Sequence, residues 1–463
     1  MTAKNLLLMS TRRLAWVILC CATLAPVLVT LAYVDERGRD VPFWDEWDRS
    51  ANLVVLDADG ALTLDDVLRT HNEHRLLLSA LITLASERLV GWSLVGEMYV
   101  SVALSFVAWL LLVSLVRQHF RERWTALLTC AALAMLVFWP AQWFNWLVGF
   151  QTQVYGFMAF SIAAIRVIAG RARGWGTVVA AAALANGAQL SQAGGIAVWP
   201  AVLAGMWMLG YRPRELALWG LIAVLSLAVF LHGYALGDPM HVGIATWAGF
   251  ALAYLGGPFV SAFDDRLVGV AMAAALAGLA LFAWTATVLL RREHGRERVA
   301  PWTMLLLLGL GTAALVARNR AEHGLSYALV SRYVTPASLA WLGLCGLCGE
   351  VVAGRARGLR IGLVPVVASV LGLALVAGLY EPTRRQALSH GLVTDDHVAC
   401  LERLPATGDY ACLAGTHPAF DADFRDAAGR DRILRLASGL ARHRLGVFAA
   451  ANDRIALTAR SDP

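Results

Sequence analysis

One early stretch of the chain, residues 41–75, concentrates side chains that could do acid–base chemistry and bind polar ligands. Its two dense clusters are Phe43-Trp44-Asp45-Glu46-Trp47-Asp48 and His71-Asn72-Glu73-His74-Arg75. A carboxylate beside an apolar wall can act as a general base, because desolvation raises its pKa toward neutral pH. The faces of Trp44 and Trp47 can stack on sugar rings, and carboxylates accept hydrogen bonds from hydroxyl groups. We therefore take Asp45, Glu46 and Asp48 as candidate catalytic residues, and the other polar and tryptophan side chains of both clusters as candidate binding residues.

The alternative for this stretch is a solvated acidic loop whose tryptophans anchor at the level of lipid headgroups. We expect the second cluster to open a helix. His71, Glu73 and His74 could then ligate a divalent cation such as Mg or Mn, with Asp45 or Glu46 completing the site. We favour a hydrogen-bonding role, with Glu73 paired to Arg75, because the sequence offers no second tight set of ligands. No metal site is therefore assigned, and the divalent cofactor stays open.

The rest of the chain is mostly hydrophobic, which places these clusters at a membrane surface. Of its 463 residues, 58% are hydrophobic and only 16% are charged, against roughly 25% charged in soluble domains. A spanning helix needs about 20 mostly apolar residues. Such runs occur at 14–34, 94–116, 124–140, 154–170, 175–190, 194–210, 215–235, 266–290, 301–317, 334–352 and 360–380. We predict an all-α integral membrane protein with about eleven transmembrane helices.

The arginines predict which connections face the cytoplasm. Arg12 and Arg13 precede the first run, and later arginine clusters fall in alternate connections. The net charge of +6 thus reports orientation and does not indicate nucleic acid. We expect a cytoplasmic N-terminus and an external loop 35–75. An odd number of spans puts the tail, residues 381–463, outside as well.

This orientation requires that two further apolar segments do not span. Residues 76–92 carry a polar stripe at helical spacing, which is typical of a helix that lies in the membrane interface. Residues 241–262 are interrupted by Gly256, Gly257 and Pro258, which favours a re-entrant or interfacial helix. The alternative is that both segments span.

Residues 142–153 form a second external loop that is rich in amides. Trp139, Trp143 and Trp146 recur at helical spacing, and we interpret these tryptophans as an aromatic belt facing lipid. Polar groups at the mouth of a helix bundle usually form hydrogen bonds. The candidate binding residues in this loop are Gln142, Asn145, Gln151 and Gln153.

A third external segment, residues 318–333, breaks the charge pattern. Its arginines need an anion, and a guanidinium grips phosphate oxygens in a bidentate way. The alternative is pairing with lipid headgroups or with the acidic first loop. The candidate binding residues here are Arg318, Arg320, His323, Arg332 and Tyr333.

The chain resembles the membrane-embedded glycosyltransferases of the GT-C superfamily. The motifs Phe43-Trp44-Asp45-Glu46-Trp47, His71-Asn72-Glu73-His74-Arg75, Gly149-Phe150-Gln151-x-Gln153 and Ser331-Arg332-Tyr333 are similar to those of a poorly characterised group of bacterial polytopic proteins. Asp45-Glu46-x-Asp48 looks like the acidic loop motif of the superfamily, and 65–92 looks like its juxtamembrane helices. The resemblance implies a GT-C-like transmembrane module over 1–380, with its first periplasmic loop at 35–92 and a small periplasmic domain at 381–463.

The resemblance also implies a reaction. A sugar would pass from a polyprenyl-phosphate donor to a hydroxyl of a glycan, lipid or protein acceptor, at the periplasmic face of a bacterial inner membrane. One carboxylate would deprotonate the acceptor, and arginine or a metal would stabilise the departing phosphate. This chemistry fits cell-envelope polysaccharide. The expected partners are donor, acceptor and membrane lipids, without nucleic acid. An O-antigen polymerase or ligase and a transporter or flippase are the alternatives.

Cys400 and Cys412 both fall in the tail, and we predict that they form a disulfide in an oxidising periplasm. Closing this short loop should contribute roughly 2–3 kcal/mol to the local fold. Alkylation of non-reduced, denatured protein checks the pairing, because bonded thiols do not react. Quantitative labelling of both cysteines would contradict it.

Overall fold

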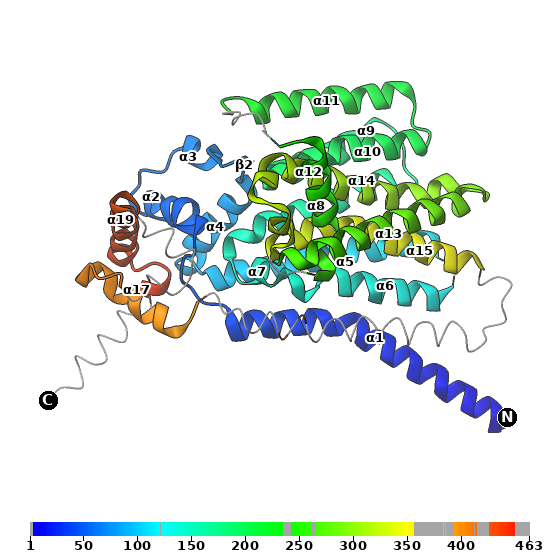
Figure 1. Cartoon of the computed structure of the whole chain (residues 1–463), viewed down its shortest axis with the longest axis horizontal. Helices are drawn as coiled ribbons and strands as arrows, with labels where there is room; N and C mark the ends of the chain where they lie inside the picture. Colours follow the sequence, from blue (N-terminus) through cyan, green and yellow to red (C-terminus); the bar gives the residue numbers. More distant parts are fainter. Residues whose placement is uncertain are drawn as a thin grey trace.

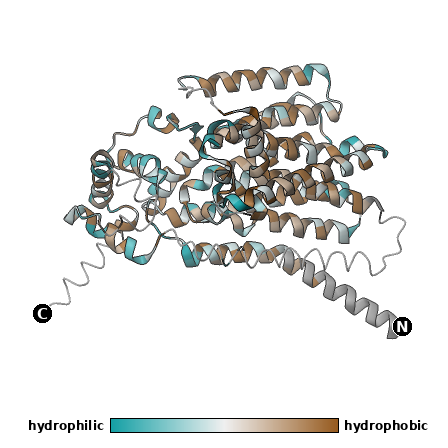
Figure 2. Ribbon diagram, viewed as in Figure 1, coloured by the Kyte–Doolittle hydropathy of each residue, from teal (hydrophilic) through white to brown (hydrophobic). Residues whose placement is uncertain are grey.

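The chain folds into a bundle of long helices with a group of shorter helices at one end (Figure 1). The computed structural model describes residues 3–120, 122–234, 242–260, 264–355, 383, 385, 393–411, 413 and 426–449. In Figure 2 the long helices are mainly hydrophobic, whereas the shorter ones carry more hydrophilic residues. The bundle contains α1 (Ala3–Arg37), α5 (Leu94–His119), α6 (Arg123–Val137), α8 (Thr152–Ile168), α9 (Trp175–Ser191), α10 (Val198–Met208), α11 (Pro213–Leu231), α12 (Ile244–Val260), α13 (Asp265–Leu290), α14 (Gly295–Arg320) and α15 (Val334–Arg355).

Six stretches of the described chain are long and apolar enough to cross a membrane, so the chain has the helices of a multi-pass membrane protein. They are Leu94–His119, Arg123–Trp146, Pro213–Leu231, Asp265–Leu290, Gly295–His323 and Ser331–Ala353. Each of the first ten predicted runs coincides with a helix. The eleventh, residues 360–380, lies outside the described residues, so the total of about eleven spans stays a prediction.

Close contacts through small residues hold the bundle together. A Cβ atom on Gly256 of α12 would lie 1.9 Å from the carbonyl oxygen of Ala271 in α13. Likewise, a Cβ atom on Gly309 of α14 would lie 2.7 Å from the backbone nitrogen of Ala340 in α15. Small residues let helix backbones approach closely in a membrane, where van der Waals packing drives association. These contacts pack α12 closely against α13, and α14 closely against α15.

The first loop forms most of the group of shorter helices. It contains the π-helical turn η1 (Trp47–Ala51), α2 (Asn52–Ala58), α3 (Leu64–Leu68), β1 (Thr70–His71), β2 (His74–Arg75) and α4 (Leu77–Val90). The prediction that the second cluster opens a helix is wrong. Its residues form a tight antiparallel hairpin in which His71 pairs with His74. Asn72 adopts φ +50°, a left-handed conformation that asparagine tolerates well, and this ends any helix at that point.

The helix α4 has 14 residues, which at about 1.5 Å per residue is shorter than the roughly 30 Å hydrocarbon core. That 76–92 does not span stays a prediction. The second excluded segment forms α12, whose 17 residues equal α8 and α9 in length. The position of α12 relative to the membrane stays a prediction.

The described part of the tail packs against the first loop. Helix α19 (Ala427–His443) packs against α2 and against α17 (Asp395–Thr407), at the same end of the molecule (Figure 1). Arg432 pairs with Asp48 at 2.8 Å, and Arg39, at the end of α1, pairs with Asp395 at 2.7 Å. The tail and the first loop therefore lie at one end of the bundle.

We predict that the first loop and the tail face the same side of the membrane. Single cysteines introduced at the exposed positions Asp65 and Arg403 should react with a membrane-impermeant maleimide in intact cells. A cysteine at Arg296, at the start of α14, should react only after permeabilisation. Labelling of positions 65 and 403 on opposite sides would contradict this arrangement.

Candidate active site

A cavity of about 410 Å³ lies where the hairpin, the first and second loops and the end of α14 meet. Its volume falls within the roughly 300–1,000 Å³ of ligand sites. The structure brings eleven of the predicted site residues to its lining: Trp44, Asp45, His71, Asn72, Glu73, His74, Gln151, Gln153, Arg320, Arg332 and Tyr333. Residues from all three predicted external segments therefore meet at one site.

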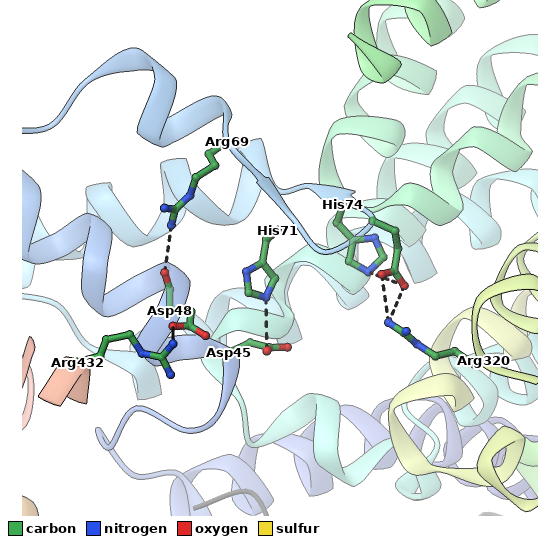
Figure 3. Close-up of polar contacts among 8 residues, drawn as sticks. Asp45, Asp48, Arg69, His71, His74, Arg320 and Arg432 are labelled. Atoms are coloured by element: carbon green, nitrogen blue, oxygen red, sulfur yellow. Dashed lines mark hydrogen bonds and ion pairs between the residues drawn. The ribbon is translucent and has the colours of Figure 1, made fainter. Parts of the chain in front are cut away.

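Asp45 is the one candidate base that lines this cavity among the described residues. Its Oδ1 lies 3.4 Å from Nε2 of His71, with 36% of the Asp45 side chain exposed (Figure 3). The His71 ring packs edge-on against Phe150, at 5.6 Å between ring centroids. The preceding residue, Trp44, has φ +54°, which is unusual for a bulky side chain. The site thus holds a partly exposed carboxylate with an imidazole beside it.

The hairpin is joined to two other elements around the cavity, the end of α14 and the turn that begins at Ala193. Glu73 accepts from Nη2 of Arg320 at 3.0 and 3.1 Å, which ties the hairpin to the end of α14 (Figure 3). His74 Nδ1 accepts the backbone N–H of Ala193 at 3.2 Å, so its proton is on Nε2, 3.9 Å from Glu73. Burial lowers the pKa of His74, although Glu73 acts in the opposite direction. His74 is therefore neutral at pH 7.

Arg75 does not line the cavity, and the predicted pairing with Glu73 is not formed. Its guanidinium donates to the carbonyl oxygens of Phe230 and His232, at the C-terminal end of α11, and of Leu68. The last carbonyl groups of a helix accept no hydrogen bond from within it, so Arg75 satisfies those of α11. A cation at the C-terminal end of a helix also interacts favourably with the helix dipole. Arg75 thus fastens the hairpin to α11.

Arg332 lies against the faces of three aromatic rings at the cavity wall. Its guanidinium carbon is 5.1 Å from the centroid of Trp44, 5.3 Å from Tyr327 and 5.2 Å from Tyr333. It also donates to the hydroxyl of Tyr327. Within the described ranges Arg332 makes no ion pair with a carboxylate, whereas Arg320 is neutralised by Glu73. Arg332 therefore keeps its positive charge available to an anion in the cavity.

The predicted amides of the second loop divide into two groups. Gln151 and Gln153 line the cavity. Gln142 and Asn145 are buried and bind Thr335, through Gln142 Oε1 at 2.6 Å and Asn145 Nδ2 at 2.7 Å. Gln142 and Asn145 therefore join the second loop to the start of α15 and do not face the cavity.

The prediction that the tryptophans of this loop form a lipid-facing belt is wrong for two of them. Trp139 and Trp146 are buried, at 3% and 1% exposure. Trp146 stacks on Tyr155 at 4.4 Å between centroids, and Trp139 Nε1 donates to the carbonyl oxygen of Pro258. Helical spacing of tryptophans is common to a belt and to a packed interface, so it did not separate the two.

The three residues that follow Asp45 do not reach the cavity lining. Trp47 is buried in the core at 1% exposure. Asp48 points away from Asp45, pairing with Arg432, while its backbone oxygen accepts from Arg69 (Figure 3). Glu46 is buried and accepts backbone N–H groups from two loops. Burial raises the pKa of Glu46 to about 8, against the opposing effect of these two donors. Of the three candidate bases, Asp45 is therefore the one that lines the cavity.

The remaining predictions lie outside the cavity or outside the described residues. Arg318 is exposed, and the ring of His323 lies 5.0 Å from that of Tyr327, between centroids, without lining the cavity.

Cys400 is buried and disulfide-bonded. Cys412 lies outside the described residues, so the pairing of these two cysteines stays a prediction. No group of three or more His, Cys, Asp or Glu side chains in the described part of the chain is arranged to hold a metal ion. The divalent cofactor, Mg or Mn, also stays a prediction.

Sequence reasoning missed several residues of the lining. Tyr327 and Asn319 lie in the third external segment but were not selected, and Gln192 follows α9. The arginine-rich segment could have indicated Tyr327, because aromatic rings near an arginine offer cation–π contacts. Nothing in the sequence around Gln192 indicated that it reaches the site.

Two solved structures are similar to this chain. The archaeal oligosaccharyltransferase AglB from Archaeoglobus fulgidus, in complex with an inhibitory peptide and a dolichol-phosphate, matches with 13% identity and a TM-score of 0.49, over 89% of this chain and 59% of that one. ArnT from Cupriavidus metallidurans, in the apo state, matches with 14% identity and a TM-score of 0.33, over 74% and 78%. No protein-family model and no curated protein sequence matches. Both structures belong to the GT-C superfamily of polytopic membrane glycosyltransferases, which the sequence motifs resemble.

The lowered pKa of His74 predicts a loss of stability in acid. Since the imidazole takes up a proton more readily when unfolded, its contribution to stability is complete above about pH 6.5 and falls as the pH drops below that value. We expect the Tm in detergent to fall less between pH 7 and pH 5 for His74→Asn, whose amide oxygen can still accept the Ala193 N–H. The exposed His294→Asn should keep the wild-type profile. Identical profiles for wild type and His74→Asn would contradict the assignment.

Proposed function

We propose that the protein transfers a sugar from a polyprenyl-phosphate donor to an acceptor hydroxyl, with the reaction taking place in the cavity beside Asp45. The observation that supports this most directly is that a carboxylate and a guanidinium line the same cavity. A partly exposed carboxylate, held by His71, shares the lining with Arg332, a cation that has aromatic neighbours and no carboxylate partner among the described residues. The first group suits a base and the second suits a phosphate.

In the proposed reaction Asp45 takes the proton of the acceptor hydroxyl. The acceptor oxygen then forms a bond to the anomeric carbon of the sugar, while the bond from that carbon to the phosphate oxygen breaks. The electron pair stays on the departing polyprenyl phosphate, and Arg332 compensates its charge. The Asp45–His71 contact holds the carboxylate in place, so little reorganisation is needed as the proton moves.

The other cavity residues fit a sugar between these two groups. Gln151, Gln153 and Asn72 offer amide donors and acceptors for ring hydroxyls. Trp44, Tyr327 and Tyr333 offer aromatic surface for the apolar faces of a ring. A site of this kind, facing the outside of a bacterial inner membrane, would accept a glycan, a lipid or a protein hydroxyl. The proposal assigns charge stabilisation to Arg332, and dependence on a divalent cation is a separate question that chelation of the purified protein tests.

We expect Asp45→Asn to lower sugar transfer about 10²–10⁴-fold, the usual effect of losing one general base. The assay follows transfer by purified protein from a polyprenyl-phosphate sugar, together with expression and Tm. The exposed Asp65→Asn, in the same loop, is the matched control and should retain activity. Full activity of Asp45→Asn would remove this carboxylate from the mechanism.

Arg332→Lys should weaken donor binding although it keeps the positive charge. Lysine lacks the planar guanidinium that both stacks on aromatic rings and holds phosphate through two hydrogen bonds. Binding of a fluorescent polyprenyl phosphate should weaken at least about 10-fold, with a larger loss for Arg332→Ala. The exposed Arg266→Lys should bind as the wild type does. Unchanged affinity in both Arg332 variants would exclude the phosphate role.

A further inference from the structure

Glu46 is a buried carboxylate directly beside the proposed base, yet it does not line the cavity. It is 1% exposed. Its Oε2 accepts the backbone N–H of Phe43 at 2.8 Å, and its Oε1 accepts the backbone N–H of Phe150 at 3.0 Å. One side chain therefore joins the first external loop to the second, across 104 positions of sequence.

The first of these hydrogen bonds closes the turn that carries Trp44 and Asp45. Trp44 has φ +54°, a conformation that a bulky residue adopts only where surrounding contacts hold it. The bond from the Phe43 N–H to the Glu46 carboxylate spans this residue, and the backbone N–H of Glu46 donates to the Phe43 carbonyl oxygen at 3.1 Å. Phe43 and Glu46 thus enclose Trp44 and Asp45 between two hydrogen bonds.

The second hydrogen bond leads back to Asp45 through other side chains. The ring of Phe150 contacts the ring of His71 edge-on, with an interplanar angle of 74°. Nε2 of His71 then lies 3.4 Å from Oδ1 of Asp45. Glu46, Phe150, His71 and Asp45 form a closed ring of contacts, because Asp45 and Glu46 are neighbours in the chain.

We propose that Glu46 is a positioning residue. By joining the first loop at Phe43 to the second loop at Phe150, it fixes the carboxylate of Asp45 in the cavity. The proposal rests on the function proposed above, and it removes Glu46 from the candidate bases. Both oxygens of the Glu46 carboxyl group accept, and an oxygen that carries the proton of the neutral acid keeps a lone pair for this. Glutamine has the same shape but presents an NH₂ group to one of the two backbone N–H groups, so one bond must break.

Amide hydrogen exchange of the full-length protein tests the structural part without any substrate. In Glu46→Gln, the peptides that contain Phe43 or Phe150 should exchange faster, by about 10-fold or more at one of the two amides, with little change elsewhere. The exposed Glu36→Gln, at the end of α1, is the matched control and should exchange as the wild type does. Unchanged exchange at both amides of Glu46→Gln would overturn the proposal.

Kinetics test the functional part. A misplaced base should lower kcat of Glu46→Gln by about 10–100-fold while leaving the affinity for polyprenyl phosphate near that of the wild type. A loss of kcat with unchanged amide exchange would make Glu46 a catalytic residue and overturn the positioning role. Absence of transfer by the wild type would contradict the proposed function instead, and the exchange rates would still decide whether Glu46 joins the loops.

A second variant covers the case in which Glu46→Gln does not fold. Phe150→Leu keeps the backbone N–H that binds Glu46 but removes the aromatic contact with His71. We expect a lower kcat and unchanged exchange at the amide of residue 150. Where both single variants fold, the loss in Glu46→Gln/Phe150→Leu should be smaller than the product of the single losses, because they break the same ring. Wild-type kcat in Phe150→Leu would overturn the proposal.

Discussion

The guanidinium of Arg332 is enclosed by the rings of Trp44, Tyr327 and Tyr333, and this arrangement sets the character of the whole site. Cation–π contacts stabilise a cation while leaving its net charge uncompensated. A carboxylate partner would have cancelled that charge, as Glu73 does for Arg320. Because Trp44 belongs to the first loop and Tyr327 and Tyr333 precede α15, the same contact also joins the two segments on which a base and a cation are carried.

Other contacts hold these two segments in their positions relative to each other. The hairpin contacts a different element through almost every residue: His71 reaches Asp45, Glu73 reaches α14, His74 reaches the turn before α10, and Arg75 reaches the end of α11. The tail adds a further restraint through Arg432 and Asp48, three residues after Asp45. This pair is partly exposed and contributes little energy by itself. The cavity is thus assembled from loops whose positions depend on each other.

Sequence patterns were informative about residue types and weak about which of them face the cavity. The apolar runs predicted ten helices at the observed places, since length and hydrophobicity govern membrane helices directly. The convergence of three polar segments followed from their predicted orientation. Periodicity could not show that Asp45 lines the cavity while Glu46 is buried, because Trp44 is left-handed and a π-helical turn follows at Trp47–Ala51. Likewise, Arg75 donates to the backbone at the end of α11 and Gln142 accepts from Thr335. Both partners are far away in sequence, and no local pattern reports them.

The most direct test of the account is an experimental structure of the protein with a polyprenyl phosphate bound. We expect the phosphate oxygens within hydrogen-bonding distance, about 3 Å, of the Arg332 guanidinium, and the carboxylate of Asp45 facing the same cavity, on the side where the sugar of the donor would lie. A phosphate bound elsewhere on the molecule, with Arg332 still enclosed by its three rings and the cavity beside Asp45 empty, would contradict the account.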